Sequence, residues 1–176
     1  MGEGWPVRES VTEYETGWYD GGYDLVEQPD GTTKRYYWAD LPPAVVVVAL
    51  DGDDVVFVEQ YRPTVREYCL ELVAGIVEDG EDYETAGTRE LREETGLVAD
   101  SVTLVQTLDV ATGVLRHERG FVVAEDLSMD ERDLDDNEFL SVRRVPRPDA
   151  IDRARAAPAN DATIEGLLLA SLDGYL

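Results

Sequence analysis

Three glutamates near the middle of this 176-residue chain have the type and spacing to bind a divalent cation. Glu90, Glu93 and Glu94 are spaced i, i+3 and i+4, so they share one face of a helix with ~3.6 residues per turn. Like charges at these spacings repel each other, and acids near the C-terminal end of a helix are unfavourable with its dipole. A cation such as Mg²⁺ would offset both penalties, because it prefers oxygen ligands and keeps positions for water and phosphate.

Neighbouring residues could complete such a site. Arg89 lies four residues before Glu93 and can form an ion pair with it on the same helix face. Glu81 lies just before the helix, and the loop that starts at Gly75 can fold back and offer a backbone carbonyl. The alternative is a solvated acidic helix face in an acidic protein, and spacing alone favours neither interpretation.

These carboxylates need a helix to carry them, and the sequence predicts one over residues 82–95. Asp82 can cap its start, and Gly96 fits the position just after its end. Gly87 inside it costs about 0.5–1 kcal/mol relative to Ala, so we expect a packing reason for this glycine.

The other predicted elements mix strands and helices without strict alternation, which favours an α+β or mixed α/β protein over a doubly wound sheet. Strands are expected at residues 44–50, 55–60, 70–74, 102–110, 119–124 and 139–145, and a short helix at residues 149–156. A last helix follows the cap Asn160-Asp161. Its predicted apolar face consists of Ile164, Leu167, Leu168 and Leu172.

Residues 1–40 are rich in aromatic side chains and turn signals. Residues 18–26 suggest two strands around a bend, Pro29-Asp30-Gly31 suggests a turn, and residues 34–38 suggest a returning strand. We therefore expect a small antiparallel sheet. Its aromatic surface must pack on the rest of the chain, on a second copy or on a ligand.

Composition narrows the classes of partner. The chain has 39 Asp and Glu against 15 Lys and Arg, for a net charge of -24, and Lys34 is its only lysine. Such a surface repels phosphate backbones and anionic membranes, so we expect no nucleic-acid or membrane partner. The same composition is expected of a halophilic cytosolic protein, because molar salt shortens the Debye length to about 3 Å and weakens self-repulsion.

Cysteine usage and hydropathy predict a cytoplasmic protein. Cys69 is the only cysteine, so no internal disulfide can form and a reducing compartment is favoured. No apolar stretch approaches the ~18 residues of a membrane span. The first residues also lack the basic and then apolar pattern of a signal peptide.

The glutamate segment resembles the Nudix box, G-x5-E-x7-R-E-U-x-E-E-x-G-U with U a bulky apolar residue. Every specified position matches, at Gly75, Glu81, Arg89, Glu90, Leu91, Glu93, Glu94, Gly96 and Leu97. The resemblance implies a Nudix hydrolase that uses Mg²⁺ or Mn²⁺ to cleave a nucleoside diphosphate linked to another moiety. It implies a Nudix-type α/β/α sandwich with a mixed sheet over residues 41–176, in addition to the N-terminal antiparallel sheet.

The same resemblance implies a role for each box residue. Glu90 and Glu94 would be the principal metal ligands, and Glu93 a further ligand, direct or through water. Arg89 would orient these carboxylates, and Glu81 would be an additional metal group or would support the ligands. Two positions outside the charged box would also join the metal site, the backbone carbonyl of Ala74 and the side chain of Glu118.

Flanking segments resemble the ADP-ribose pyrophosphatase branch of this family. They are Glu59-Gln60-Tyr61-Arg62, Leu70-Glu71-Leu72-Val73-Ala74-Gly75 and Asn160-Asp161-Ala162-Thr163, with Val73 where Pro is usual. The branch implies that Arg62 and Glu71 bind substrate and that Trp18 or Trp38 stacks on the base. It also implies a homodimer in which residues 1–40 are exchanged.

Other features leave alternatives open. Ala111-Thr112-Gly113 stands where many enzymes of the branch have Ser-Pro-Gly, which admits a dinucleotide polyphosphate or oxidised-nucleotide hydrolase. The branch takes its general base from a late acidic loop, which here favours Glu138 and then Asp136. A non-catalytic nucleotide sensor is a further alternative, although sensors are expected to lose box carboxylates and none is lost here. A Ca²⁺-binding module is disfavoured because no EF-hand pattern is present.

Overall fold

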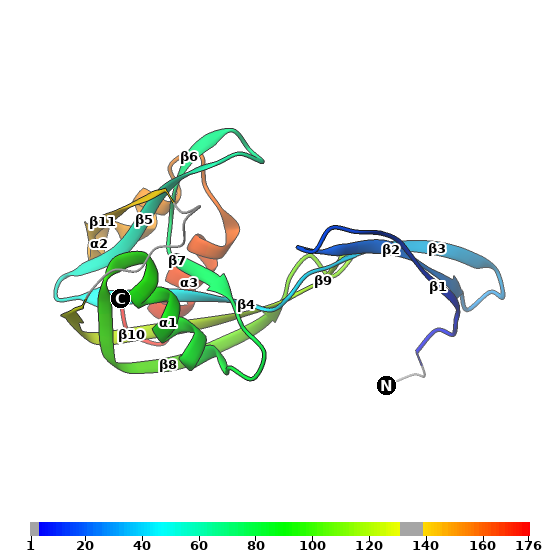
Figure 1. Cartoon of the computed structure of the whole chain (residues 1–176), viewed down its shortest axis with the longest axis horizontal. Coiled ribbons are helices and arrows are strands. Elements are labelled where there is room, and N and C mark those ends of the chain that lie inside the picture. Colours follow the sequence, from blue (N-terminus) through cyan, green and yellow to red (C-terminus); the bar gives the residue numbers. More distant parts are fainter. Residues whose placement is uncertain (1–3, 131–138) are drawn as a thin grey trace. The chain divides into compact units, whose positions relative to one another are not determined.

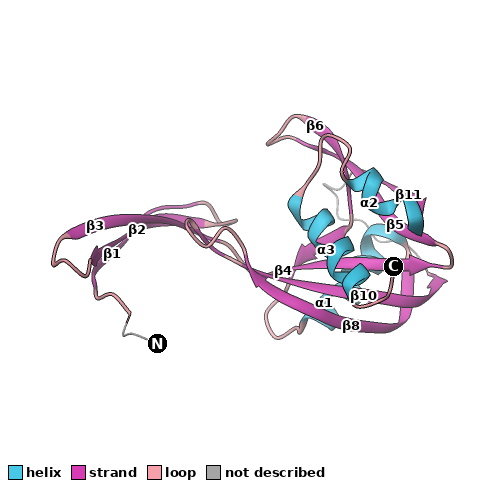
Figure 2. Ribbon diagram, turned by 180° about the vertical axis from the view of Figure 1, so that it is seen from behind, coloured by secondary structure: helices cyan, strands magenta, loops and turns pink. Residues whose placement is uncertain are grey.

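The computed structural model of the chain describes residues 4–130 and 139–176 (Figures 1 and 2). The described residues form two compact units. One comprises Met1–Pro43 with Leu108–Glu118, and the other comprises Ala44–Thr107 with Arg119–Leu176. Among the described residues, no helix has both the length and the apolar character to cross a membrane.

The N-terminal unit is a four-stranded sheet in the order β1-β2-β3-β9. Its strands are β1 (Val7–Glu15), β2 (Asp20–Glu27), β3 (Thr33–Asp40) and β9 (Leu115–Arg116). The first three form an antiparallel meander, and β9 adds to β3 in parallel. The small antiparallel sheet is therefore present, with one parallel strand from later in the chain.

Two glycines explain why residues 18–26 were wrongly predicted to bend. Gly21 and Gly22 lie inside the continuous strand β2. A Cβ on Gly21 would lie 2.2 Å from the Tyr14 ring, and one on Gly22 would lie 2.0 Å from the Val11 carbonyl oxygen. The glycines thus allow β1 to approach β2 closely, and they do not mark a turn.

The C-terminal unit is built on a mixed sheet in the order β11-β5-β4-β10-β8, with β6 paired to β5 and β7 paired to β4. β4 and β10 are parallel. The pairs β11–β5, β4–β5, β4–β7 and β5–β6 are antiparallel. The strands are β4 (Ala44–Asp51), β5 (Asp54–Arg62), β6 (Glu67–Glu71), β7 (Val73–Ile76), β8 (Leu97–Asp109), β10 (Glu118–Met129) and β11 (Leu140–Pro146).

Helices cover both faces of this sheet (Figures 1 and 2). The helices are α1 (Tyr83–Thr95), α2 (Arg147–Ala154) and α3 (Asp161–Leu172). Gly87 of α1 lies against Val47 and Val122, whereas Gly166 of α3 lies against Val48 and Phe121. Successive residues of a strand point to opposite faces, so α1 and α3 pack on opposite sides. This confirms the predicted α/β/α sandwich and supplies the packing reason for Gly87.

The predicted apolar face of α3 is wrong. Leu172 is 82% exposed and Leu168 is also exposed, whereas Thr163, Gly166 and Ala170 are buried with Leu167. A Cβ on Gly166 would lie 2.9 Å from the Leu72 side chain, so the helix axis lies too close to the sheet for large residues. Small residues therefore form the packed face, and hydrophobicity alone does not identify it.

Helix α2 also begins earlier than predicted. It starts at Arg147, so Pro148 lies in its first turn and does not interrupt it. A proline is tolerated there because the backbone N–H that it lacks would have no partner within the helix.

Candidate active site

Helix α1 is bounded as the sequence predicts. The Asp82 carboxylate accepts a hydrogen bond from the Thr85 backbone N–H at 2.8 Å. Gly96 adopts the left-handed conformation with φ of 72°, and its N–H donates to the Arg92 carbonyl at 2.8 Å. These two caps fix the start and end of the helix that carries the glutamates.

Two of the three glutamates are buried. Glu90 is 8% exposed and Glu94 is 3% exposed, whereas Glu93 lies at the edge of the same face and is partly exposed. Burial of a carboxylate is costly unless charge or hydrogen bonds compensate it. A solvated acidic face would leave these side chains in water, so their burial contradicts that interpretation.

The Glu90 carboxylate lies directly against the backbone of β7. A Cβ on Gly75 would lie 1.9 Å from both the carboxyl carbon and Oε1 of Glu90. Only glycine leaves room for the side chain here. Ala74, the proposed carbonyl ligand, precedes Gly75 in the same strand. Glu90 thus lies against the strand that carries Ala74, and carboxylate and carbonyl oxygens are ligand types that suit Mg²⁺ or Mn²⁺.

Arg89 organises the remaining box residues. Its Nε and Nη2 donate to the two oxygens of Glu81 at 3.0 Å each. Its Nη1 donates to Glu90 at 2.8 Å and to Glu93 at 3.1 Å, and Nη2 also donates to the Ile76 carbonyl at 2.8 Å. The hydrogen bond from Arg89 outweighs desolvation and lowers the pKa of the Glu81 carboxyl, while the pKa of the Arg89 guanidinium is raised, chiefly by Glu81. The guanidinium therefore holds three carboxylates in one place.

The carboxylates of Glu81, Glu90 and Glu93 are held together by Arg89 and are not arranged as a metal coordination shell. Within residues 4–130 and 139–176, no three acidic, histidine or cysteine side chains form a group that could hold a metal ion. The metal-ligand roles of Glu90, Glu93, Glu94, Glu81 and the Ala74 carbonyl therefore stay a prediction. Glu118 belongs to the N-terminal unit, and its part in the metal site stays a prediction. The predicted general bases, Glu138 and Asp136, lie outside the described residues.

Arg62 is held by a buried carboxylate. Its Nε donates to Oε2 of Glu71 at 2.8 Å, and its Nη2 forms an ion pair with the same oxygen at 2.8 Å. Glu71 is 5% exposed, and its two oxygens also accept from Gln60 and Asn160. The sequence prediction grouped Glu71 with the substrate contacts, whereas the structure shows its carboxylate bound to protein donors. Neither Gln60 nor Asn160 was predicted to take part, because the sequence marks Asn160 only as a helix cap.

The two candidate stacking residues differ in accessibility. Trp18 is 65% exposed and lies in a turn where the Thr16 hydroxyl accepts from the backbone N–H groups of Trp18 and Tyr19. Trp38 donates from Nε1 to Asp24 at 3.2 Å, and the Arg116 guanidinium lies 4.0 Å from its ring centroid. One face of Trp38 is thus covered within its own unit, and Trp18 is the more available of the two.

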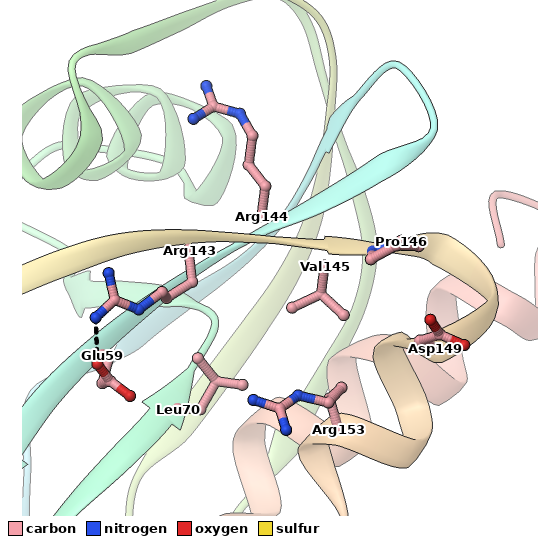
Figure 3. Close-up of a pocket in the computed structure, with 8 residues that line it drawn as sticks. All are labelled: Glu59, Leu70, Arg143, Arg144, Val145, Pro146, Asp149 and Arg153. Atoms are coloured by element: carbon pink, nitrogen blue, oxygen red, sulfur yellow. Dashed lines mark hydrogen bonds and ion pairs between the residues drawn. The ribbon is translucent and has the colours of Figure 1, made fainter.

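A separate pocket of about 220 Å³ lies beside β11 and α2 (Figure 3). Arg143 of β11 forms an ion pair with Glu59 at 2.6 Å on one side, and Arg153 extends from α2 toward Leu70. Its lining consists of Glu59, Leu70, Arg143, Arg144, Val145, Pro146, Asp149 and Arg153. None of the box residues borders it, so this cavity is distinct from the carboxylate site.

Comparisons with known proteins agree with the geometry. The family model described as NUDIX domain matches residues 40–167. ADP-ribose pyrophosphatase of Bacillus subtilis (strain 168) is 32% identical over 140 residues, which covers 78% of this chain and 76% of that protein. The methanol dehydrogenase activator of Bacillus methanolicus is 32% identical over 131 residues, or 73% and 71% of the two chains. A crystal structure of an ADP compounds hydrolase has the same fold, with a TM-score of 0.88, 23% identity and coverage of 99% and 98%.

Proposed function

The chain belongs to the Nudix hydrolase family, and we propose that it hydrolyses the pyrophosphate bond of ADP-ribose or a related nucleoside diphosphate sugar. Water would attack one phosphorus, the bond to the bridging oxygen would break, and the products would be a nucleoside monophosphate and a sugar phosphate. The observation that carries this proposal is the burial of Glu90 and Glu94 on one face of α1, with Glu90 against the β7 backbone.

The proposed cofactor is Mg²⁺ or Mn²⁺, held by Glu90 and Glu94 with Glu93 and the Ala74 carbonyl. When bound, the cation supplies positive charge that offsets the pyrophosphate oxygens and favours ionisation of water. Arg89 keeps Glu81, Glu90 and Glu93 in place at 2.8–3.1 Å before any ligand arrives. This preorganisation reduces the rearrangement that substrate binding requires.

Other residues would bind the substrate and accept the proton. Arg62 would donate to a phosphate or ribose oxygen, and Trp18 would stack on the base, because both side chains are accessible. Glu138, or else Asp136, would take the proton of the attacking water. The base must lie within hydrogen-bond reach of that water only when substrate is bound.

We also propose that the enzyme acts as a homodimer through its N-terminal unit. Four aromatic side chains are exposed among the described residues of this unit, which favours a partner surface. They are Trp5, Tyr14, Trp18 and Tyr37. Size-exclusion chromatography with light scattering tests this: wild type should elute as a dimer, and a monomer at all concentrations would contradict the proposal.

Turnover is tested with purified protein, Mg²⁺ and a panel of substrates, by chromatographic detection of nucleoside monophosphate. The panel contains ADP-ribose, ADP-glucose, diadenosine polyphosphates and oxidised nucleotides. Glu94→Gln should lower kcat by ~100-fold, because loss of one ligand charge removes about 3 kcal/mol of transition-state stabilisation. Gln106→Glu, an exposed change on β8, is the control. No monophosphate from any substrate would contradict the proposed function.

The turn at residues 111–115 supports a second candidate substrate class, the dinucleotide polyphosphates. Ala111 has a φ of 45°, and residues 111–115 form a turn in which the Val114 and Leu115 N–H groups donate to the Ala111 carbonyl. This turn replaces the proline-containing segment that many ADP-ribose enzymes have. Faster turnover of diadenosine polyphosphates than of ADP-ribose would favour this second class. If wild type binds nucleotide without turnover, and Glu94→Gln leaves that affinity largely intact, a sensor function is favoured instead.

A further inference from the structure

We infer that Asn160 is a positioning residue that orients Arg62 through Glu71, and so sets the affinity of the enzyme for the oxygens of its nucleoside diphosphate substrate. The inference rests on the proposed function. It assigns to the N-terminal cap of α3 a role that neither its sequence position nor its helix-capping geometry requires.

Glu71 is the centre of this arrangement. Its Oε2 accepts from the Nε of Arg62 at 2.8 Å and from the Gln60 amide at 3.1 Å, and it also forms an ion pair with Nη2 of Arg62 at 2.8 Å. Its Oε1 accepts from Nδ2 of Asn160 at 2.6 Å. The two oxygens are thus oriented from opposite directions, by β5 on one side and by the start of α3 on the other. A buried carboxylate with donors to both oxygens has little freedom to rotate.

Arg62 gains a fixed orientation from this carboxylate. Its side chain is 44% exposed, whereas that of Glu71 is 7% exposed, so Glu71 holds the guanidinium from the protein side. A guanidinium has five N–H donors in a planar fork; here Nε donates to Glu71 and Nη2 forms an ion pair with it. The remaining N–H donors can bind a substrate oxygen. An anchored fork also loses less side-chain entropy on binding than a freely rotating one.

The start of helix α3 contacts Glu71 and Leu72 at two points. Asn160 uses its Oδ1 to accept from the Thr163 N–H at 2.8 Å, while its Nδ2 donates to Glu71. The Thr163 hydroxyl accepts from the backbone N–H of Leu72, the residue after Glu71, at 3.1 Å. The first turn of α3 therefore fixes both the side chain of Glu71 and the backbone that follows it.

The residue type at position 160 supports a role beyond capping. Asp and Ser cap helices about as well as Asn, because each offers an oxygen to the first-turn N–H groups. Neither an ionised Asp nor the short Ser side chain can cap the helix and also donate to Glu71 at this distance. Asn satisfies both requirements, because its Oδ1 caps the helix while its Nδ2 donates to Glu71. Asn160→Ser therefore retains the cap and loses only the bond to Glu71, whereas Asn160→Asp retains the cap and also places a second carboxylate beside Glu71.

The experiment compares wild type with Asn160→Ser and Asn160→Asp, each alone and combined with Arg62→Ala, and measures kcat and KM for ADP-ribose with Mg²⁺. Asn160→Ser should raise KM about tenfold with kcat within about twofold, because it removes a charge-assisted contact that orients a binding group. Asn160→Asp should raise KM at least as much, because its carboxylate also repels that of Glu71. In the Arg62→Ala background they should change KM by less than about twofold, since a residue that acts through Arg62 is not additive with its loss. Gln106→Glu is the exposed charge control.

A second measurement does not depend on turnover. The hydrogen exchange rate of the Arg62 Nε–H, measured by NMR, should rise about tenfold or more in both Asn160 variants and stay unchanged in Gln106→Glu. Equal KM effects with and without Arg62 would show a merely structural role and overturn the inference. If wild type cleaves no nucleoside diphosphate sugar, the proposed function fails, and an unchanged Arg62 exchange rate would then overturn the positioning role by itself.

Discussion

Gly75 shows how one missing side chain determines where a carboxylate can lie. The Glu90 carboxyl group occupies the space that a Cβ at position 75 would need, at 1.9 Å from its position. The glycine of the box motif is therefore explained by close approach of a charged side chain to a strand. The sequence marks this glycine by its motif position, but the atom that lies against it is known only from the fold.

Gly75→Ala should displace the Glu90 carboxylate and strongly weaken metal binding at this site. We expect Mn²⁺ affinity to fall by ~100-fold or more, because the overlap cannot be relieved without moving the carboxylate. Isothermal titration with Mn²⁺ measures it. Gly4→Ala is the control, since nothing lies within 4 Å of a Cβ there. Equal affinity in wild type and Gly75→Ala would show that Glu90 is not a ligand.

The Glu81–Arg89 pair makes a pH-dependent contribution to stability. The hydrogen bond from Arg89 lowers the folded-state pKa of Glu81 below the usual range of a glutamate carboxyl. A lowered carboxyl pKa adds stability above the unfolded-state pKa, and this stability is lost as pH falls through the folded-state pKa. The loss from this pair therefore lies below about pH 5.

Glu81→Gln tests that contribution. The free energy of unfolding, from urea denaturation at about pH 7 and about pH 3, should fall less steeply on acidification in the variant than in wild type. At about pH 7 the variant should be less stable, because Arg89 loses a charged partner. Parallel pH dependences for the two proteins would contradict the assigned cause of the pKa shift.

At the scale of elements, local signals in the sequence predicted the boundaries of α1 and the positions of several strands. Asp82 and Gly96 act on adjacent backbone groups, so their positions can be read directly. Strand β1 was not predicted because almost all of its residues are exposed and no alternation marks it. The face of α3 was predicted wrongly because close approach at Gly166 favours small residues over leucines.

The contacts between elements could not be predicted. Arg89 was expected to pair with Glu93 four residues away, and this contact is present at 3.1 Å. Its bonds to Glu81 and to the Ile76 carbonyl depend on the path of the loop between β7 and α1. The Asn160–Glu71 bond joins residues 89 positions apart, a separation over which no periodic pattern acts.

Thr163→Val tests how α3 is attached to the sheet. The change keeps the shape of the side chain and removes the oxygen that accepts from the Leu72 N–H in a buried position. Leaving that N–H without a partner should lower the free energy of unfolding by about 1–3 kcal/mol. Urea denaturation measures this. Thr88→Val, whose hydroxyl donates to the Glu84 carbonyl within α1, should change stability by less than about 0.5 kcal/mol.

At the scale of the whole molecule, net charge governs stability. A net charge of -24 on 176 residues produces self-repulsion that favours the unfolded chain. Salt screens this repulsion, and the Debye length falls from about 10 Å at 0.1 M to about 3 Å at 1 M. We expect the Tm, measured by calorimetry, to rise by several degrees between about 0.1 M and 1 M KCl. A constant or falling Tm would show that contacts within the fold already compensate the repulsion between acidic side chains.

The same charge is a reason why the proposed diphosphate substrate would need a cation. An anionic protein repels phosphate, and a bound divalent ion would reverse the local field at the carboxylates of α1. Attraction by the negative charge on the rest of the surface also favours uptake of the cation. The catalytic proposal therefore depends on one prediction, that Glu90 and Glu94 bind a hard divalent ion.

Anomalous diffraction from a crystal soaked in Mn²⁺ tests that prediction most directly. We expect one anomalous peak or more at about 2.1–2.2 Å from carboxylate oxygens of both Glu90 and Glu94. An ordered crystal in which Mn²⁺ occupies other sites, or none, while these two side chains contact no ion would contradict it.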